Sequence, residues 1–251
     1  MEKIIPTLLI EKLIFGGNGL GHHDGKVVFV PMTLPGEVVE VEIVREKKDY
    51  AEGVVRQLLK TSPERSVPPC PVFGVCGGCQ VQHLSAEAQI RHKTEIANEF
   101  IGQVRQEEPF TSYPILSSPS PLHYRLRAQL AIQNGQIGFY QKRSHAIVPI
   151  MTCPLLATPL NAALAFLAGD GMAALTGISE VEIQGNDTGE LLIVLIGQGF
   201  SHDKRRSFFK LATAALSPVS LRGLIVYDRG KRFCVGDNTL IEKLLCRHLF
   251  W

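Results

Sequence analysis

The chain has 251 residues, with 26 Lys and Arg against 24 Asp and Glu, so its net charge of +2 indicates no class of partner. A hydrophobic fraction of 45% with 20% charged residues excludes intrinsic disorder. Six cysteines are too few for a disulfide-built fold, and Pro6 interrupts the apolar start, which argues against a secretory signal. The longest uncharged stretch, 146–169, contains three evenly spaced prolines, which argues against a membrane helix. We predict a soluble, cytoplasmic protein.

The first sixty residues have the pattern of short strands joined by turns. Asp24-Gly25 is typical of a hairpin turn, and residues 37–43 alternate charged and apolar side chains. Several short strands in so few residues predict a small β-barrel over residues 1–60. Residues 61–69 contain three prolines and predict a linker and the first domain boundary.

The segment 70–110 begins with cysteines and glycines and has little expected regular structure before Ser85. Ser85 is a predicted N-cap, because the apolar residues that follow it recur at helical spacing. We expect a helix of roughly 17 residues there, about 25 Å long.

Residues 111–251 mix strand pairs with helices. Asn134-Gly135 predicts a hairpin whose first strand covers residues 125–133. Helices are predicted over 155–167 and 203–216, between further strands. Strand pairs interleaved with helices predict an α+β domain.

Charge is unevenly distributed in this second part of the chain. Residues 111–169 contain no Asp or Glu, and residues 201–251 contain ten Lys and Arg against four acids. Such basic stretches suit a polyanionic partner, although solvated surface charge gives the same pattern.

Four cysteines have the spacing of a metal centre. Cys70, Cys76 and Cys79 lie within ten residues, and Cys153 precedes a proline far downstream. Three clustered cysteines with one distant cysteine favour an iron–sulfur cluster, while zinc and free or disulfide-bonded thiols are the alternatives.

Four segments resemble one known family: EKLIFGGNGLGHHDGKVVFVPMTLPGEVVEVEI at 11–43, SPERSVPPCPVFGVCGGCQVQHLSAEAQIRHK at 62–93, HYRLRAQ at 123–129, and IGFYQKRSHAIVPIMTCPL at 137–155. They are similar to the bacterial RNA uracil-5-methyltransferases, which use S-adenosylmethionine to methylate uridines of 23S rRNA and related RNAs. The resemblance extends over nearly the whole chain. The cysteine spacing, with its distant cysteine–proline pair, is highly specific to that family.

The resemblance implies an α+β protein with an N-terminal OB-like barrel, a TRAM domain, in residues 1–60. A cluster loop and helix would follow in 70–110, and an RNA-recognition domain in 111–251 joined to the cluster through Cys153. Cys70, Cys76, Cys79 and Cys153 match the ligands of a [4Fe–4S] cluster.

The resemblance also implies that the chain ends before the family's methyltransferase domain. S-adenosylmethionine would then be needed only where such a domain is supplied, and the chain alone would be inactive. The residues agree, because no complete glycine-rich cofactor turn is present. Cys234 and Cys246 are interpreted as small core residues. We predict no catalytic and no cofactor-binding residue.

The predicted RNA contacts come from the acid-free stretch. Arg125 and Arg127 are two apart and should share one face of a strand, and Lys142, Arg143 and His145 stand beside two aromatic residues. The expected partner is structured RNA, rRNA in particular, and neither DNA nor a membrane. The predicted function is therefore RNA binding and iron–sulfur scaffolding within an rRNA-processing methyltransferase. The alternatives are an iron–sulfur redox or sensor protein and a zinc-bound, four-cysteine RNA-binding adaptor.

Overall fold

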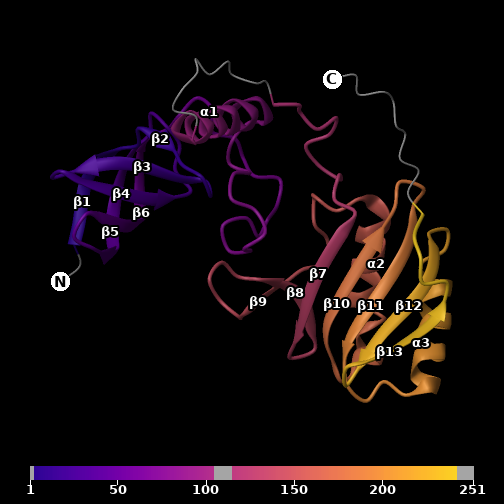
Figure 1. Cartoon of the computed structure of the whole chain (residues 1–251). Helices are drawn as coiled ribbons and strands as arrows, with labels where there is room; N and C mark the ends of the chain where they lie inside the picture. The colour runs from indigo at the N-terminus through magenta and orange to yellow at the C-terminus, as the bar shows by residue number, and fades with distance from the viewer. Residues whose placement is uncertain (1–2, 105–114, 242–251) are drawn as a thin grey trace. The chain divides into compact units, whose positions relative to one another are not determined.

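The computed structural model describes residues 3–104 and 115–241 and divides the chain into two compact units (Figure 1). The barrel unit comprises residues 1–74 and 79–119, and the sheet unit comprises residues 75–78 and 120–251. None of the helices in the described ranges combines the length and apolar character that crossing a bilayer requires.

The barrel unit begins with a six-stranded sheet in the order β1-β5-β6-β4-β3-β2. The strands are β1 (Lys3–Leu9), β2 (Lys12–Leu13), β3 (Asn18–His23), β4 (Lys26–Pro31), β5 (Val38–Glu46) and β6 (Tyr50–Lys60). β1 pairs with β5, and β2 pairs with β3. Because β1 and β2 are almost continuous, and Glu11 N–H donates to the Leu20 carbonyl at 2.8 Å, the sheet closes on itself. The predicted small barrel is confirmed.

Alternation along the strands produces the barrel core. Val39 and Val41 are fully buried in β5, where the sequence alternates charged and apolar residues. The same core contains Ile5, Leu8, Ile10, Val28, Val30 and Ala51.

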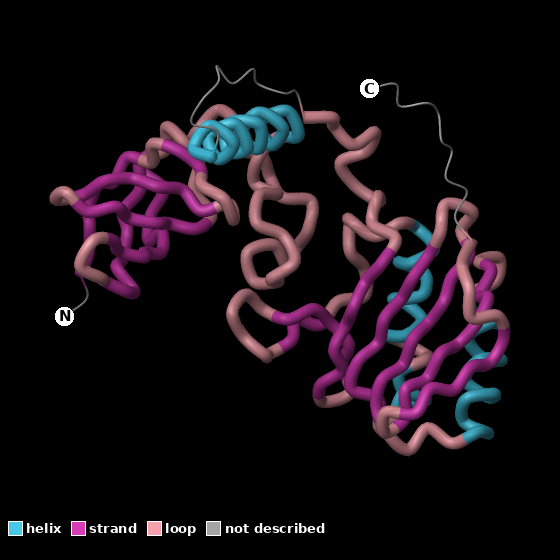
Figure 2. The backbone as a smooth tube through the Cα atoms, viewed as in Figure 1, coloured by secondary structure: helices cyan, strands magenta, loops and turns pink. Residues whose placement is uncertain are grey.

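Residues 61–74 and 79–85 form loops (Figure 2), and long-range hydrogen bonds hold them within the barrel unit. Ser66 N–H donates to the His83 carbonyl at 2.9 Å, and Ser85 N–H donates to the Glu64 carbonyl at 3.1 Å. The linker expected at 61–69 therefore lies inside a compact unit, and the units divide at residues 75–78 and 120 instead. Prolines explain the irregular backbone, whereas the hydrogen bonds that fix it are long-range.

The helix of this unit, α1 (Ala86–Val104), begins as predicted. The Ser85 hydroxyl accepts the Ala88 N–H at 3.2 Å, which satisfies one of the free donors of the first turn.

The sheet unit contains a seven-stranded sheet in the order β13-β12-β11-β10-β7-β8-β9. Its strands are β7 (Arg127–Gln133), β8 (Gln136–Tyr140), β9 (Ile147–Pro149), β10 (Ile178–Gly185), β11 (Glu190–Gly197), β12 (Ser220–Asp228) and β13 (Lys231–Gly236). Only β11 and β12 pair in parallel. Its helices are α2 (Thr158–Ala168), a short 3₁₀ turn (Met172–Leu175) and α3 (His202–Ala215). The predicted α+β class is confirmed.

Figure 1 shows α2 and α3 on one face of this sheet. β11 supplies the fully buried Leu191, Ile193 and Leu195 to its core. The predicted hairpin at Asn134-Gly135 is present, and both residues have positive φ, 52° and 71°.

β7 is shorter than predicted, because Arg125 pairs with another segment. Arg125 N–H donates to the Leu155 carbonyl at 2.8 Å, and its own carbonyl accepts the Ala157 N–H at 3.0 Å. The strand expected from residue 125 therefore begins at Arg127.

Candidate cysteine centre and RNA interface

The four predicted cluster ligands are divided between the two units. Cys70 and Cys79 lie in the barrel unit, whereas Cys76 and Cys153 lie in the sheet unit. All four are partly exposed, and they form no disulfide in the described structure. Within the described residues, no three Cys, His, Asp or Glu side chains are already arranged around a metal position. Assembly of the centre stays a prediction.

In the sheet unit, Cys76 is held by the end of β8. Its segment forms an isolated bridge with Gln141, and Gly77 N–H donates to the Tyr140 carbonyl at 2.9 Å. A Cβ atom at Gly77 would lie 3.0 Å from that carbonyl oxygen, a tight contact that favours glycine here. The Gly78 N–H points at Cys76 Sγ, 3.4 Å away. Such N–H···S contacts stabilise a thiolate ligand.

Cys153 is fixed by Asn161, a side chain that the sequence interpretation missed. The Asn161 Oδ1 accepts the Cys153 N–H at 2.8 Å, and its Nδ2 donates to the carbonyls of Cys153 and Leu156 at 3.0 and 2.9 Å. One side chain thereby holds both ends of the Cys153 turn. A signal was present, since Asn161 is the only amide in the otherwise apolar TPLNAALAFLA of α2.

In the barrel unit, the residues beside Cys70 and Cys79 pack on each other. The rings of Phe73 and His83 lie 5.5 Å apart at 31°. His83 is 1% exposed, and within the described structure the buried side-chain amide of the neighbouring Gln82 has no hydrogen-bond partner. Burial lowers the pKa of His83 to about 4, and the positive charge of Arg65 acts in the same direction.

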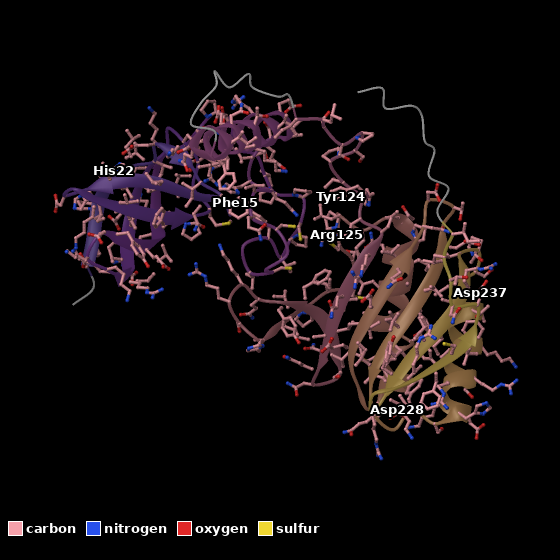
Figure 3. The ribbon with its side chains drawn as sticks, viewed as in Figure 1. Phe15, His22, Tyr124, Arg125, Asp228 and Asp237 are labelled. Carbon is pink, nitrogen blue, oxygen red and sulfur yellow. The ribbon has the colours of Figure 1, made fainter. Side chains whose placement is uncertain are left out.

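Of the predicted RNA contacts, Arg127 is already engaged. Its Nε and Nη2 donate to Glu182 on β10 at 2.6 and 2.9 Å. This hydrogen bonding lowers the pKa of Glu182 in spite of its partial burial, and it raises the pKa of Arg127. Contrary to the prediction, Arg125 lies outside the strand that contains Arg127. Both arginines line a polar cleft of about 720 Å³ with Gln184. Arg125 is labelled in Figure 3.

Lys142, Arg143 and His145 lie together on the exposed turn between β8 and β9. The Tyr140 ring meets the His145 ring edge-on, with centroids 6.2 Å apart. Gln133 Nε2 donates to the His145 carbonyl at 2.7 Å, which fixes the turn on β7. The turn therefore presents cations beside an aromatic ring, next to the Cys76 segment.

Cys234 was interpreted as a core residue, and that interpretation is wrong. It is exposed on β13, because the neighbouring Phe233 is the residue that turns toward α3. Cys246 lies outside the described residues.

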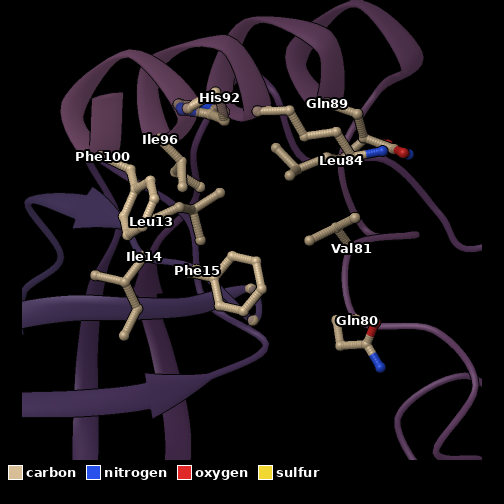
Figure 4. A pocket seen from close by; sticks show the side chains of 14 residues that line it. Leu13, Ile14, Phe15, Gln80, Val81, Leu84, Gln89, His92, Ile96 and Phe100 are labelled. Carbon is tan, nitrogen blue, oxygen red and sulfur yellow. The ribbon is translucent and has the colours of Figure 1, made fainter. Parts of the chain in front are cut away.

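A separate apolar groove of about 860 Å³ lies between α1 and the β2–β3 turn of the barrel unit (Figure 4). Phe15 and Phe100 at its border are 90% and 67% exposed. The lining is apolar with few polar groups, so this groove does not have the chemistry of a phosphate site.

The chain is similar to known proteins both in its barrel and over most of its length. Residues 6–55 match the TRAM domain family. An uncharacterised RNA methyltransferase of Bdellovibrio bacteriovorus is 44% identical over 58% of this chain and 37% of its own length. Another, of Halalkalibacterium halodurans, is 30% identical over 94% of this chain and 55% of its own length. The 23S rRNA (uracil(1939)-C(5))-methyltransferase RlmD of Shewanella amazonensis is 37% identical over 62% of this chain and 36% of its own.

Among solved structures, the tRNA (uracil-54, C5)-methyltransferase of Pyrococcus abyssi, in complex with S-adenosyl-L-homocysteine, has a similar fold. The TM-score is 0.68 at 20% identity, over 95% of this chain and 57% of that one. The chain thus spans from about a third to just over half of the length of these relatives. It has a TRAM-type barrel in residues 6–55 and is similar over most of its length to RNA methyltransferases.

Proposed function

We propose that this chain is the RNA-binding and iron–sulfur-binding part of an S-adenosylmethionine-dependent RNA uracil-5-methyltransferase. The observation that carries the proposal is the way the sheet unit holds Cys76 and Cys153. Two close backbone contacts and one clamping amide fix thiols that form no disulfide. Hydrogen bonds that fix the residue in this way are typical of metal ligands and not of incidental surface cysteines.

The donor set fits a [4Fe–4S] cluster. Four thiols with a backbone N–H directed at one sulfur suit iron–sulfur chemistry, and the backbone packs closely at Gly77, beside Cys76. When bound, the cluster would connect the segments that carry its four ligands. In this proposal Cys70, Cys76, Cys79 and Cys153 hold it, and Asn161 and Gly77 position the loops of two of them.

The RNA surface is proposed on the β8–β9 turn. Lys142, Arg143 and His145 supply phosphate-binding charge, and Tyr140, 45% exposed, supplies a ring on which a base can stack. Arg125, in the polar cleft with Gln184, is proposed as a further RNA contact, whereas Arg127 contributes less, because Glu182 occupies two of its donors. The partner is structured RNA, and 23S rRNA is the first to test, because RlmD relatives are named for it.

We infer that the whole protein takes its methyl group from S-adenosylmethionine, as the names of its relatives indicate. No residue in the described ranges is assigned to that cofactor or to methyl transfer. The chain's own contribution is to bind and orient RNA.

The test is metal analysis of the chain purified and reconstituted without oxygen. We expect close to four irons and four sulfides per chain, lost in Cys79→Ser and kept in Cys234→Ser, the matched control outside the centre. Zinc without sulfide would overturn the cluster and favour an adaptor. A reversible redox potential with no RNA affinity would favour a redox protein.

RNA binding is tested with Lys142→Gln/Arg143→Gln. Glutamine is used because Arg143 has a φ of 57°, so a long polar side chain changes the charge without changing the backbone strain of an L-residue. Weaker binding across RNA sequences with unchanged melting is expected, and unchanged binding would remove this turn from the interface.

A further inference from the structure

A second basic surface lies in the sheet unit. We call it the α3 platform; it consists of six exposed cations on α3 and the β12–β13 turn, namely Lys204, Arg206, Lys210, Arg229, Lys231 and Arg232. Its only nearby acids in the sequence are Asp203 and Asp228.

Several cations elsewhere in the described structure are neutralised by a carboxylate partner. Lys3 and Lys26 pair with Glu46, Lys12 pairs with Glu99, and Arg222 pairs with Asp237. In the described ranges, none of the six platform cations forms an ion pair. Unpaired cations gathered on one region give a positive field that opposite charge has not cancelled.

The platform is held rigid from below. Asp228 accepts N–H groups of Gly199 and Phe200 at 3.2 and 2.9 Å, and Arg229 N–H donates to the Gly197 carbonyl at 3.2 Å. These bonds fix the loop before α3 to the β12–β13 turn, beside the Asp228 labelled in Figure 3. The Asp228 carboxylate is thereby used within the fold.

Arg205 completes this support and does not belong to the surface. It is 8% exposed, donates to the Phe200 carbonyl at 2.6 Å, and places its guanidinium carbon 4.0 Å from the ring centre of Phe233 on β13. The contact holds α3 on β13, so the cations of both elements keep fixed relative positions.

We propose that the α3 platform binds the phosphate backbone of RNA, as a second contact surface separate from the β8–β9 turn. The proposal rests on the proposed function and adds a site to it. Tyr227, 38% exposed, is the register partner of Arg232 across β12 and β13, and both lie on the face of the sheet opposite to Phe233 and α3. The platform therefore continues around the end of the sheet, where a stacking ring stands beside a cation. Cations next to a partly exposed ring suit RNA, and a second contact surface lengthens the RNA that one chain can orient.

The test measures the affinity of the full chain for a labelled, structured 23S rRNA fragment over a series of KCl concentrations. Arg206→Ala/Lys210→Ala removes two cations at helix positions where alanine is well tolerated. Lys231→Ala/Arg232→Ala removes two from β13. The matched control, Lys47→Ala/Lys48→Ala, removes the same charge from the exposed β5–β6 turn.

Each lost phosphate contact reduces the magnitude of the negative slope of log affinity against log salt by about 0.7–0.9. Each platform variant should therefore reduce that magnitude by about 1.4–1.8, and the control should leave it unchanged. Equal slopes in all variants and wild type would overturn the platform while RNA binding by the wild type persists. Equal loss in platform and control variants would show an effect of net charge alone and would also overturn it. Absence of RNA binding by the wild type would instead contradict the proposed function itself. Loss of binding to phosphatidylserine vesicles, with RNA binding unchanged, would assign the surface to lipid.

Discussion

Each unit contains an Arg–Glu pair in which the arginine Nε and Nη2 meet both carboxylate oxygens, and these two pairs have nearly the same geometry. In the barrel unit, Arg65 Nε and Nη2 lie 2.6 and 2.7 Å from the two carboxylate oxygens of Glu37. In the sheet unit, Arg127 makes the corresponding contacts with Glu182 at 2.6 and 2.9 Å. Their surroundings differ, since the Glu37 side chain is fully buried and the Arg127 side chain is 68% exposed.

The difference determines what each pair does. Glu37 also accepts N–H groups of Leu34 and Ser62, and Arg65 donates to the Met32 carbonyl, so this pair fixes residues 61–66 on the barrel. Burial alone would raise the pKa of Glu37, but the hydrogen bonds from Arg65, Leu34 and Ser62 lower it overall. Arg127 and Glu182 connect β7 and β10, which the strand ladder already joins. Burial, and not the ion pair as such, therefore makes the first pair structural.

The comparison predicts the largest effect for Arg65→Ala. Removing the guanidinium leaves a buried carboxylate charge without its counter-charge, which costs roughly 3–5 kcal/mol of unfolding free energy. Urea unfolding followed by the barrel's circular dichroism measures it. A loss below about 1 kcal/mol would mean that the pair acts as a surface pair after all.

If hydrogen-bonded burial determines the cost, a neutral side chain should show it too. Asn161→Ala removes three bonds to the Cys153 turn, and leaving these backbone groups without partners should cost about 2 kcal/mol of unfolding free energy. The reconstituted variant should also release its iron faster to a chelator. The unfolding free energy of Asn161→Asp, which keeps an acceptor for the Cys153 N–H, should fall between those of the wild type and Asn161→Ala.

Acidification should distinguish the stabilities of the two units, with a smaller effect than the two substitutions above. The folded-state pKa of His83 is lowered to about 4 from 6.5, so below pH 6.5 the unfolded chain binds a proton that the folded barrel unit does not. This contribution is full above pH 6.5 and is lost as the pH falls toward 4, by at most about 1.4 kcal/mol per pH unit. Glu37, whose pKa is lowered from 4.5, adds a loss only below that value. His83→Leu should reduce the dependence of the urea unfolding midpoint on pH in the barrel unit between pH 6.5 and 5. A pH dependence equal to that of the wild type would exclude His83 as its source.

Local signals were sufficient for much of the fold. Asp24-Gly25 and Asn134-Gly135 both form the predicted turns, with positive φ at each residue, because turn chemistry depends on adjacent residues alone. Ser85 caps α1 for the same reason. The barrel followed from period-two alternation, which reports one buried face whatever the partner strand is.

The candidate site was less predictable, because its partners are distant in sequence. Nothing near Arg127 indicates that Glu182, 55 residues away, will take its guanidinium, and Arg65 meets Glu37 across 28 residues. The four cysteines were recognisable as candidate ligands from their spacing, whereas the clamp by Asn161 requires knowing how α2 packs. Charge at a residue is readable from sequence, but whether that charge is already paired is not.

The smallest expected effect is that of Arg127→Ala on stability. The Arg127 side chain is mostly exposed, so solvent and salt screen its attraction to Glu182, and the strands it joins stay paired without it. We expect the melting temperature of the sheet unit to change by no more than roughly 3 °C. RNA affinity should change little as well, because two of the five N–H donors of the guanidinium already serve Glu182, whose charge offsets that of Arg127. Glu182→Gln provides the informative control, since it keeps the shape of the partner and frees the Arg127 charge. If that variant binds the 23S rRNA fragment more tightly and with a steeper salt dependence, Glu182 holds Arg127 away from RNA; if Arg127→Ala alone abolishes binding, the ion pair must open when RNA binds.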